Sequence, residues 1–85
     1  FKLHQNYPNP FNPSTTIKFD LPVKELVNIK IFDVMGREVI TLHEGLLSAG
    51  SYETSWDASK VTSGTYFFRI AAGDFIETKI MMLIK

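Results

Sequence analysis

The stretch that decides the fold lies in the last third of the 85-residue chain and reads Ser63-Gly64-Thr65-Tyr66-Phe67-Phe68-Arg69-Ile70. Side chains two residues apart lie on the same face of a β-strand, and this stretch divides cleanly into two such sets. One set comprises Tyr66, Phe68 and Ile70, and the other comprises Phe67, Arg69 and Ala71. We therefore predict a half-buried strand with one face toward a core and one face toward solvent.

Three runs upstream show the same alternation of apolar and polar residues. The positions predicted to share one face are Ile17, Phe19 and Leu21; Val27, Ile29 and Ile31; and Tyr52, Thr54 and Trp56. Short turn sequences separate the runs, and Asp33–Arg37 fits a tight hairpin with Gly36 at a positive φ. No window predicts a helix of three turns, although Asp57–Ser63 has room for one helical turn. The pattern predicts an all-β fold, an immunoglobulin-like antiparallel β-sandwich of six to seven strands.

Two runs depart from simple alternation. In Glu38–Leu42 the neighbours Val39 and Ile40 are both apolar, which indicates a bulge or an edge strand. The closing run Phe75–Ile84 begins with alternation and then becomes apolar at every position. Such a strand is either covered on both faces, which we expect, or it waits for a partner.

Composition excludes several classes of function. Nine basic and nine acidic residues give a net charge of zero, so nothing predicts binding to nucleic acid or to an anionic membrane. There is no cysteine, hence no disulfide and no thiolate metal site, and no apolar run reaches the about 18 residues that span a bilayer.

The chain starts at Phe1 without methionine or signal peptide, so we expect a module of a longer protein. Residues 1–85 are expected to form a single domain, with a leading segment at 1–14 and the sandwich at 15–85.

Residues that carry catalytic or cofactor chemistry are sparse. His4 and His43 are the only histidines, and neither has the spacing of a catalytic triad or a metal site, so His43 is interpreted as a solvated strand residue. Asn6, Asn9 and Asn12 carry amide oxygens but lack the acidic neighbours of a calcium loop. We predict no enzyme activity, no cofactor and no metal. Aromatic side chains remain candidates for stacking on sugar, namely Tyr7, Phe11 and Phe67, whereas Trp56 is assigned to the core.

The leading segment holds three prolines and three asparagines within Gln5–Pro13. Proline fixes φ and restrains the residue before it, and asparagine forms local turns, so the segment is stiff. We expect Tyr7 and Phe11 to pack onto the sandwich as anchors. The anchoring residues proposed here are Tyr7, Pro8, Asn9, Pro10 and Phe11.

These motifs together resemble a known family. Phe1–Leu3 followed by Gln5–Ile17 closely resembles the opening of type A C-terminal sorting domains of the type IX secretion system. The remaining blocks that carry the resemblance are Ile31–Asp33 with Gly36–Val39, Ala49–Tyr52 with Trp56–Asp57, Ser63–Ile70 with Ala72–Gly73, Phe75, Thr78–Lys79 and the basic end Lys85. One departure is that only Lys79 is basic after Thr78, where many members carry a basic pair. The latter half also resembles the immunoglobulin-like domain of flagellar hook-capping proteins.

The resemblance implies that the domain is an address label. Such domains end secreted enzymes and adhesins of Bacteroidetes-type bacteria, whose cargo reaches the periplasm by a separate signal. The implied partners are the type IX outer-membrane translocon, its shuttle proteins, the covalently fused N-terminal cargo and a sortase that cleaves near or before Phe1. The protein would pass through the periplasm and end at the outer-membrane surface or outside the cell.

A recognition surface follows as a hypothesis, because an apolar edge strand can pair with the sheet of another protein. Thr78–Lys85, beside the strand that starts at Gly64, would be the surface that is read. The candidate recognition residues are Gly64, Tyr66, Phe67, Arg69, Lys79, Met82, Leu83, Ile84 and Lys85. The same edge offers a route to self-association. Two alternatives stay open: a passive or carbohydrate-binding accessory module, which requires an exposed aromatic row, and a hook-capping-like assembly domain.

Overall fold

Seven β-strands and no helix make up the computed structural model of the chain, which describes all residues 1–85. The strands are β1 (Lys2–Leu3), β2 (Ser14–Leu21), β3 (Glu25–Asp33), β4 (Glu38–Leu47), β5 (Gly50–Asp57), β6 (Gly64–Ala72) and β7 (Phe75–Leu83). The helical turn considered for Asp57–Ser63 is absent: the Asp57 carboxylate accepts a bond from the Ser59 N–H at 2.9 Å and stabilises a simple turn instead. With no helix present, none is long and apolar enough to cross a membrane.

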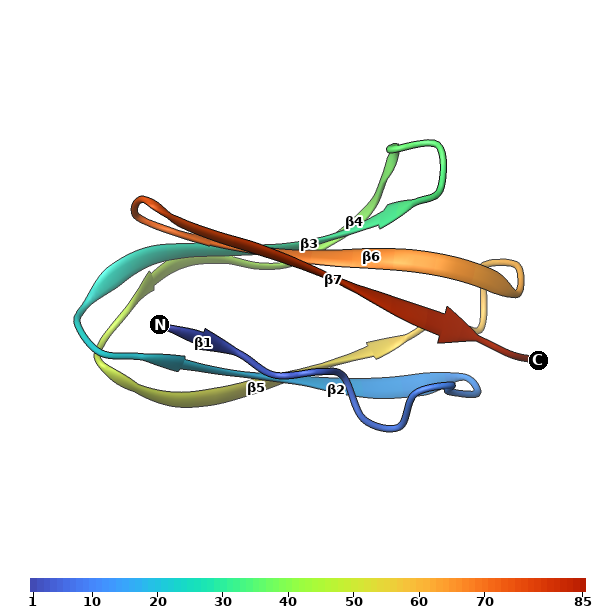
Figure 1. Cartoon of the computed structure of the whole chain (residues 1–85), viewed down its shortest axis with the longest axis horizontal. Helices are drawn as coiled ribbons and strands as arrows, with labels where there is room; N and C mark the ends of the chain where they lie inside the picture. Colours follow the sequence, from blue (N-terminus) through green and yellow to red (C-terminus); the bar gives the residue numbers. More distant parts are fainter.

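The strands form two antiparallel sheets that face each other, as Figure 1 shows. One sheet has the order β1-β2-β5 and the other the order β4-β3-β6-β7. In the three-stranded sheet, β2 pairs with β5 along its whole length, from Ser14 opposite Asp57 to Leu21 opposite Gly50. The all-β sandwich predicted from period-two alternation is therefore confirmed.

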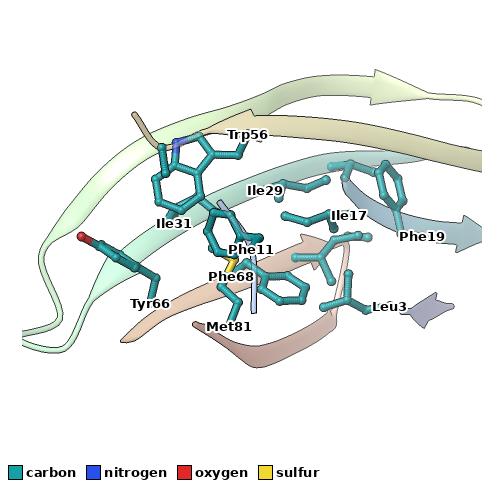
Figure 2. Packing of buried hydrophobic residues seen from close by; sticks show 14 of the residues in the cluster. Leu3, Phe11, Ile17, Phe19, Ile29, Ile31, Trp56, Tyr66, Phe68 and Met81 are labelled. Atoms are coloured by element: carbon teal, nitrogen blue, oxygen red, sulfur yellow. The ribbon is translucent and has the colours of Figure 1, made fainter. Parts of the chain in front are cut away.

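The core lies between the sheets and is built from the inward residues that alternation predicts. The fully buried side chains include Ile17 of β2, Ile29 and Ile31 of β3, and Phe68 of β6, and Figure 2 shows how they interdigitate. Trp56 is at the centre of an aromatic group, because its ring lies 5.4 Å from that of Tyr66 and 5.8 Å from that of Phe11. Such pairs are typically worth about 0.5–1.5 kcal/mol beyond the area that they bury.

Tyr66 adds a hydrogen bond that is typical of immunoglobulin-like sandwiches. It is buried at the start of β6, and its hydroxyl donates to the Thr62 carbonyl at 2.6 Å. A tyrosine whose hydroxyl bonds to the backbone just upstream, where the chain passes from one sheet to the other, is the tyrosine corner of this architecture. The bond connects the loop after β5 to the beginning of strand β6.

β4 is an edge strand with bulges, as predicted. Its register against β3 shifts twice, between Ile29 and Lys30 and between Ile31 and Phe32. The residues left over on β4 are Leu42 and Val39, so the adjacent apolar pair in the sequence marks a real irregularity in the ladder.

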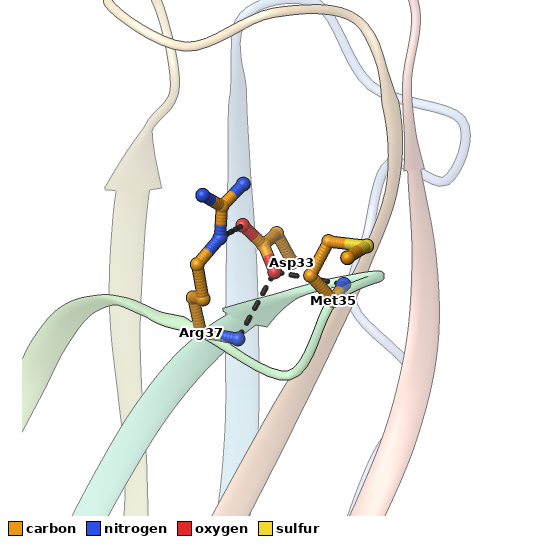
Figure 3. Close-up of polar contacts among 3 residues, drawn as sticks. All are labelled: Asp33, Met35 and Arg37. Carbon is orange, nitrogen blue, oxygen red and sulfur yellow. Dashed lines mark hydrogen bonds and ion pairs between the residues drawn. The ribbon is translucent and has the colours of Figure 1, made fainter.

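The hairpin between β3 and β4 is stabilised by Asp33. One carboxylate oxygen accepts bonds from the N–H groups of Met35 at 2.9 Å and Arg37 at 3.0 Å, and the other pairs with Arg37 Nε at 3.0 Å (Figure 3). The backbone bond from Arg37 is the main cause that lowers the pKa of Asp33 below its ordinary value. Gly36 has φ at +80°, which confirms the predicted turn. Glycine is favoured at this φ because it has no Cβ to clash with the backbone.

Candidate functional site

The two faces of β7 differ sharply in burial. Met81 and Leu83 point into the core and are 0% and 1% exposed, whereas Ile80 and Met82 point outward and are 55% and 42% exposed. The expectation that this apolar strand is covered on both faces is therefore wrong. The physical reason is that the sandwich has only two layers, so the outer face of its four-stranded sheet has no layer above it.

An apolar strip crosses three strands on this outer face. In the ladder, Phe32 of β3 lies opposite Phe67 of β6, and Phe67 lies opposite Ile80 of β7. Met82 follows two residues after Ile80 and lies on the same face. We call Phe32, Phe67, Ile80 and Met82 the outer strip. Alternation marked Phe67 as outward, but it did not show that the residues beside it in space are also apolar.

Arg69 borders the outer strip and is held in place by an aromatic ring. Its guanidinium carbon lies 4.7 Å from the centre of the Phe32 ring, which is a cation–π contact. Arg69 Nε is buried and makes no hydrogen bond within the chain. Phe32, Phe67, Arg69 and Thr78 line a shallow depression of about 300 Å³ at this place. The arrangement presents a fixed positive charge beside apolar surface.

The polar neighbours of Arg69 are paired with one another. Lys30 Nζ lies 3.1 Å from a Glu38 carboxylate oxygen, and Thr41 donates to the other oxygen at 3.1 Å. The Lys30 contact is the main cause that lowers the pKa of Glu38 below its ordinary value. Arg69 is therefore the cation on this face that has no carboxylate partner within the chain.

Four of the candidate recognition residues lie away from the outer face. Tyr66 and Leu83 are buried in the core, and Gly64 pairs with Leu83 at the end of the β6–β7 ladder. Lys79 lies opposite the inward residue Phe68, and its ammonium is 3.5 Å from Glu77. These residues support the hairpin, whereas Phe67, Arg69 and Met82 converge on one surface.

Lys85 also has a structural role. Its ammonium donates to the carbonyls of Ser59, at 2.8 Å, and Val61, and its N–H donates to the Ser63 hydroxyl at 3.1 Å. The side chain is thus tied to the loop after β5. Ile84 beside it remains exposed.

Of the two aromatic anchors predicted in the leading segment, Phe11 packs onto the sandwich and Tyr7 does not. Phe11 is 2% exposed and enters the core beside Trp56, which confirms its assignment. Tyr7 is 81% exposed, so the expectation that its ring packs on the sandwich is wrong. Only its backbone is held, through two hydrogen bonds with Thr16 of β2 at 3.0 and 2.9 Å.

A buried polar contact shapes the turn between these two aromatics. The Asn6 amide donates to the Thr15 hydroxyl at 2.9 Å and to the Pro8 carbonyl at 3.1 Å. Thr15 in turn donates to the same carbonyl at 2.8 Å. These bonds engage the Asn6 amide with the turn itself.

The segment then reaches the free edge of β7, which sequence reasoning missed. Phe11 N–H donates to the Met82 carbonyl and Ile84 N–H donates to the Phe11 carbonyl, both at 3.0 Å, in a parallel bridge. The Asn9 side-chain oxygen accepts from Met82 N–H at 3.0 Å, and the Gln5 amide donates to the Ile80 carbonyl at 2.8 Å. The edge from Ile80 to Ile84 is therefore covered by the chain itself. No periodic pattern in the sequence links residues so far apart.

The two histidines have different surroundings. His4 Nε2 lies 2.9 Å from the Asp20 carboxylate, and this hydrogen bond is the main cause that lowers the pKa of Asp20 below its ordinary value. His43 is half-buried with Nε2 shielded and unpaired, so its interpretation as a solvated residue is wrong. No group of three or more histidine, cysteine or acidic residues is placed to hold a metal ion.

The aromatic row that sugar binding requires is also not formed. Phe11 is in the core, Tyr7 lies beside β2 of one sheet, and Phe67 lies on β6 of the other. The three rings that the sequence suggested for stacking therefore occupy three separate places, and nothing in the structure favours the carbohydrate-binding alternative.

Comparison with known proteins identifies a family. No curated protein is similar to this sequence. The profile of the family described as "Secretion system C-terminal sorting domain" matches residues 5–85, which includes strands β2 to β7 and the outer strip. The chain therefore belongs to the family of C-terminal sorting domains of the type IX secretion system.

Proposed function

We propose that this domain directs a fused cargo protein to the type IX outer-membrane translocon and is then removed by a sortase. Family membership makes the domain a signal for the type IX secretion machinery and implies an attached cargo that is exported across the outer membrane. The proposal adds the steps: transit through the periplasm, recognition by the translocon or its shuttle proteins, and cleavage near or before Phe1. The domain is the substrate of that cleavage.

The observation that carries the docking part of this proposal is the exposure of the outer strip. Ile80 and Met82 are large apolar residues with about half of their surface in water, beside Phe67 and a charged Arg69. Contiguous exposed apolar surface rimmed by polar groups is typical of a protein-binding site. Apolar area with one fixed guanidinium is also the composition found in the central part of protein interfaces.

The experiment is a secretion assay with a fluorescent reporter. Residues 1–85 are fused behind a periplasmic reporter in a bacterium with the type IX machinery, and a strain without the machinery is the control. The test variant is Ile80→Ser with Met82→Ser. The matched control is Leu26→Ser, because Leu26 is equally apolar and exposed but lies at the other end of the same sheet.

We expect machinery-dependent export of the wild type and of the Leu26 variant, with loss of a tag of about 10 kDa, as a single small domain weighs. The double variant should stay folded and remain in the periplasm. Export of the double variant at the wild-type rate would refute the outer strip as the docking surface. Retention of the wild type itself would refute the sorting function.

A further inference from the structure

Residues Gln5–Pro13, here called the covering segment, occupy a place where a strand of another protein would fit. We propose that the outward edge of β7 from Ile80 to Ile84 is a strand-addition site, closed in the free domain by the covering segment. Its partner is an extended polypeptide that pairs parallel to β7 and carries an aromatic side chain. The edge site itself does not depend on the proposed sorting function. Only the assignment of its partner to the type IX machinery rests on that function.

The edge presents a complete set of backbone groups for pairing. In a strand, the N–H and C=O of one residue point to the same side, and successive residues alternate. On β7 the backbone N–H and C=O groups of Met81 and Leu83 are directed toward β6, and those of Met82 and Ile84 are directed away from it. The covering segment satisfies four outward groups: the Ile80 and Met82 carbonyls and the Met82 and Ile84 N–H groups.

The covering segment binds this edge much less extensively than β6 binds the other. β6 and β7 pair in a continuous ladder from Gly64 opposite Leu83 to Ala72 opposite Phe75. The covering segment makes a single bridge at Phe11 and otherwise relies on the side chains of Gln5 and Asn9. Its three prolines have no N–H to donate, so it cannot form a regular ladder. A partner with an ordinary backbone can form more hydrogen bonds at the same edge.

The present occupant shows what the partner must supply. Phe11 fills a core position beside Trp56, so a segment that replaces it needs an aromatic or similarly large apolar side chain there. The Ile80–Ile84 edge of a second copy has no aromatic residue, which argues against edge-to-edge pairing of two domains. A partner strand at this edge would also lie next to Ile80 and Met82 of the outer strip, which joins the two surfaces into one interface.

Hydrogen exchange of the intact domain tests whether the edge opens. We expect the Met82 and Ile84 amide protons to exchange at least about tenfold faster than those of Met81 and Leu83, because the first pair is released when only the covering segment detaches. Equal exchange of all four amides would mean that the edge opens only on global unfolding, and it would overturn the proposal.

Binding in trans tests whether the edge accepts a strand. The probe is a fluorescent peptide with the sequence of residues 5–13, added to the full-length variant Asn9→Ala with Phe11→Ala. We expect saturable binding to this variant, at least tenfold weaker binding to the wild type, and no binding of a probe that carries Phe11→Ala. The control is Asn12→Ala, because the Asn12 side chain makes no hydrogen bond, and it should behave as wild type.

The remaining outcomes of the binding test are also decisive. No binding to a folded Asn9/Phe11 variant would overturn the proposal, and Trp56 fluorescence reports whether the variant is folded. If it is unfolded, Asn9→Ala alone is used, and it should raise hydrogen exchange at the Met82 amide but not at the Met81 amide.

A wild-type dimer in which each covering segment pairs with β7 of the other copy would identify a second copy as the occupant and refute a heterologous partner. Because purified protein is used throughout, failure here leaves the sorting function untouched, whereas failure of export alone leaves the edge site untouched.

Discussion

Phe67 and Phe68 are neighbours in β6 and chemically identical, yet they belong to two different surfaces. Phe68 is fully buried between the sheets, and Phe67 lies partly exposed on the outer strip. The same contrast holds on β7, where Met81 is buried and Met82 is exposed. The comparison shows that apolar residues of this hairpin lie in two environments, the core on the inner face and solvent on the outer face, where we propose that a partner docks.

The largest effect should separate the two phenylalanines. Phe68→Ala removes a fully buried ring and should destabilise the domain by about 3–5 kcal/mol, which is much of the stability of a small domain. Phe67→Ala should cost less, about 1–2 kcal/mol, because its ring is only partly buried on a face with no layer above it. Urea unfolding followed by Trp56 fluorescence measures both. Equal losses would show that the outer strip is part of the core, and the comparison would fail.

A smaller effect should come from the hydroxyl of Tyr66. Tyr66→Phe keeps the buried ring and leaves the Thr62 carbonyl without its donor, so we expect a loss of about 0.5–1.5 kcal/mol. Export should remain unchanged, because Tyr66 does not reach the outer face. Loss of export in a variant that is still folded would instead place Tyr66 in the recognition surface.

A further test uses the cation–π contact at the border of the outer strip. Arg69→Met keeps an apolar stem over Phe32 and removes the charge, and it should cost about 0.5–1 kcal/mol. The effect should vanish in a Phe32→Leu background, which a double-mutant cycle measures. An undiminished effect in that background would show that the Phe32 ring does not position Arg69.

The smallest effect concerns acid stability at the β3–β4 turn. The pKa of Asp33 is lowered in the folded domain from an ordinary value of 3.8, so its charged form stabilises the fold above that pH and the contribution is lost as the pH falls through the folded pKa. Wild type should exceed Asp33→Asn in stability at about pH 6, and the gap should narrow by about pH 3. A gap that is the same at both values would rule out the carboxylate as its source.

The sequence predicts the sandwich well because the relevant signal is local. Alternation in β2, β3 and β6 identified the inward residues, and glycine at position 36 identified the positive φ of its turn. The edge position and bulges of β4 also followed from two adjacent apolar residues. In each case the pattern that fixes the structure lies within one element.

The candidate site was only partly predictable because its contacts join distant residues. A strand apolar at every position does not say whether a third layer exists, so the exposure of Ile80 and Met82 required the structure. Tyr7 and Phe11 look equivalent in a proline-rich segment without periodicity, yet only Phe11 enters the core. The pairing of Asn9 with Met82 connects the two ends of the chain and has no local signature.

The route of the leading segment also determines how the domain responds to force. The N-terminus lies toward one end of the long axis and the C-terminus at the other, as Figure 1 shows. We expect tension applied at Phe1 to reach the contacts in chain order: first the two-residue β1, then Gln5 at the Ile80 carbonyl and the bridge of Tyr7 to β2, and then Phe11 at the edge of β7. Each of these contacts rests on a few hydrogen bonds, whereas the ladders of β2 with β5 and β6 with β7 run the full length of the strands. We therefore expect a pull from the N-terminal side to detach the covering segment from β7 before these ladders separate.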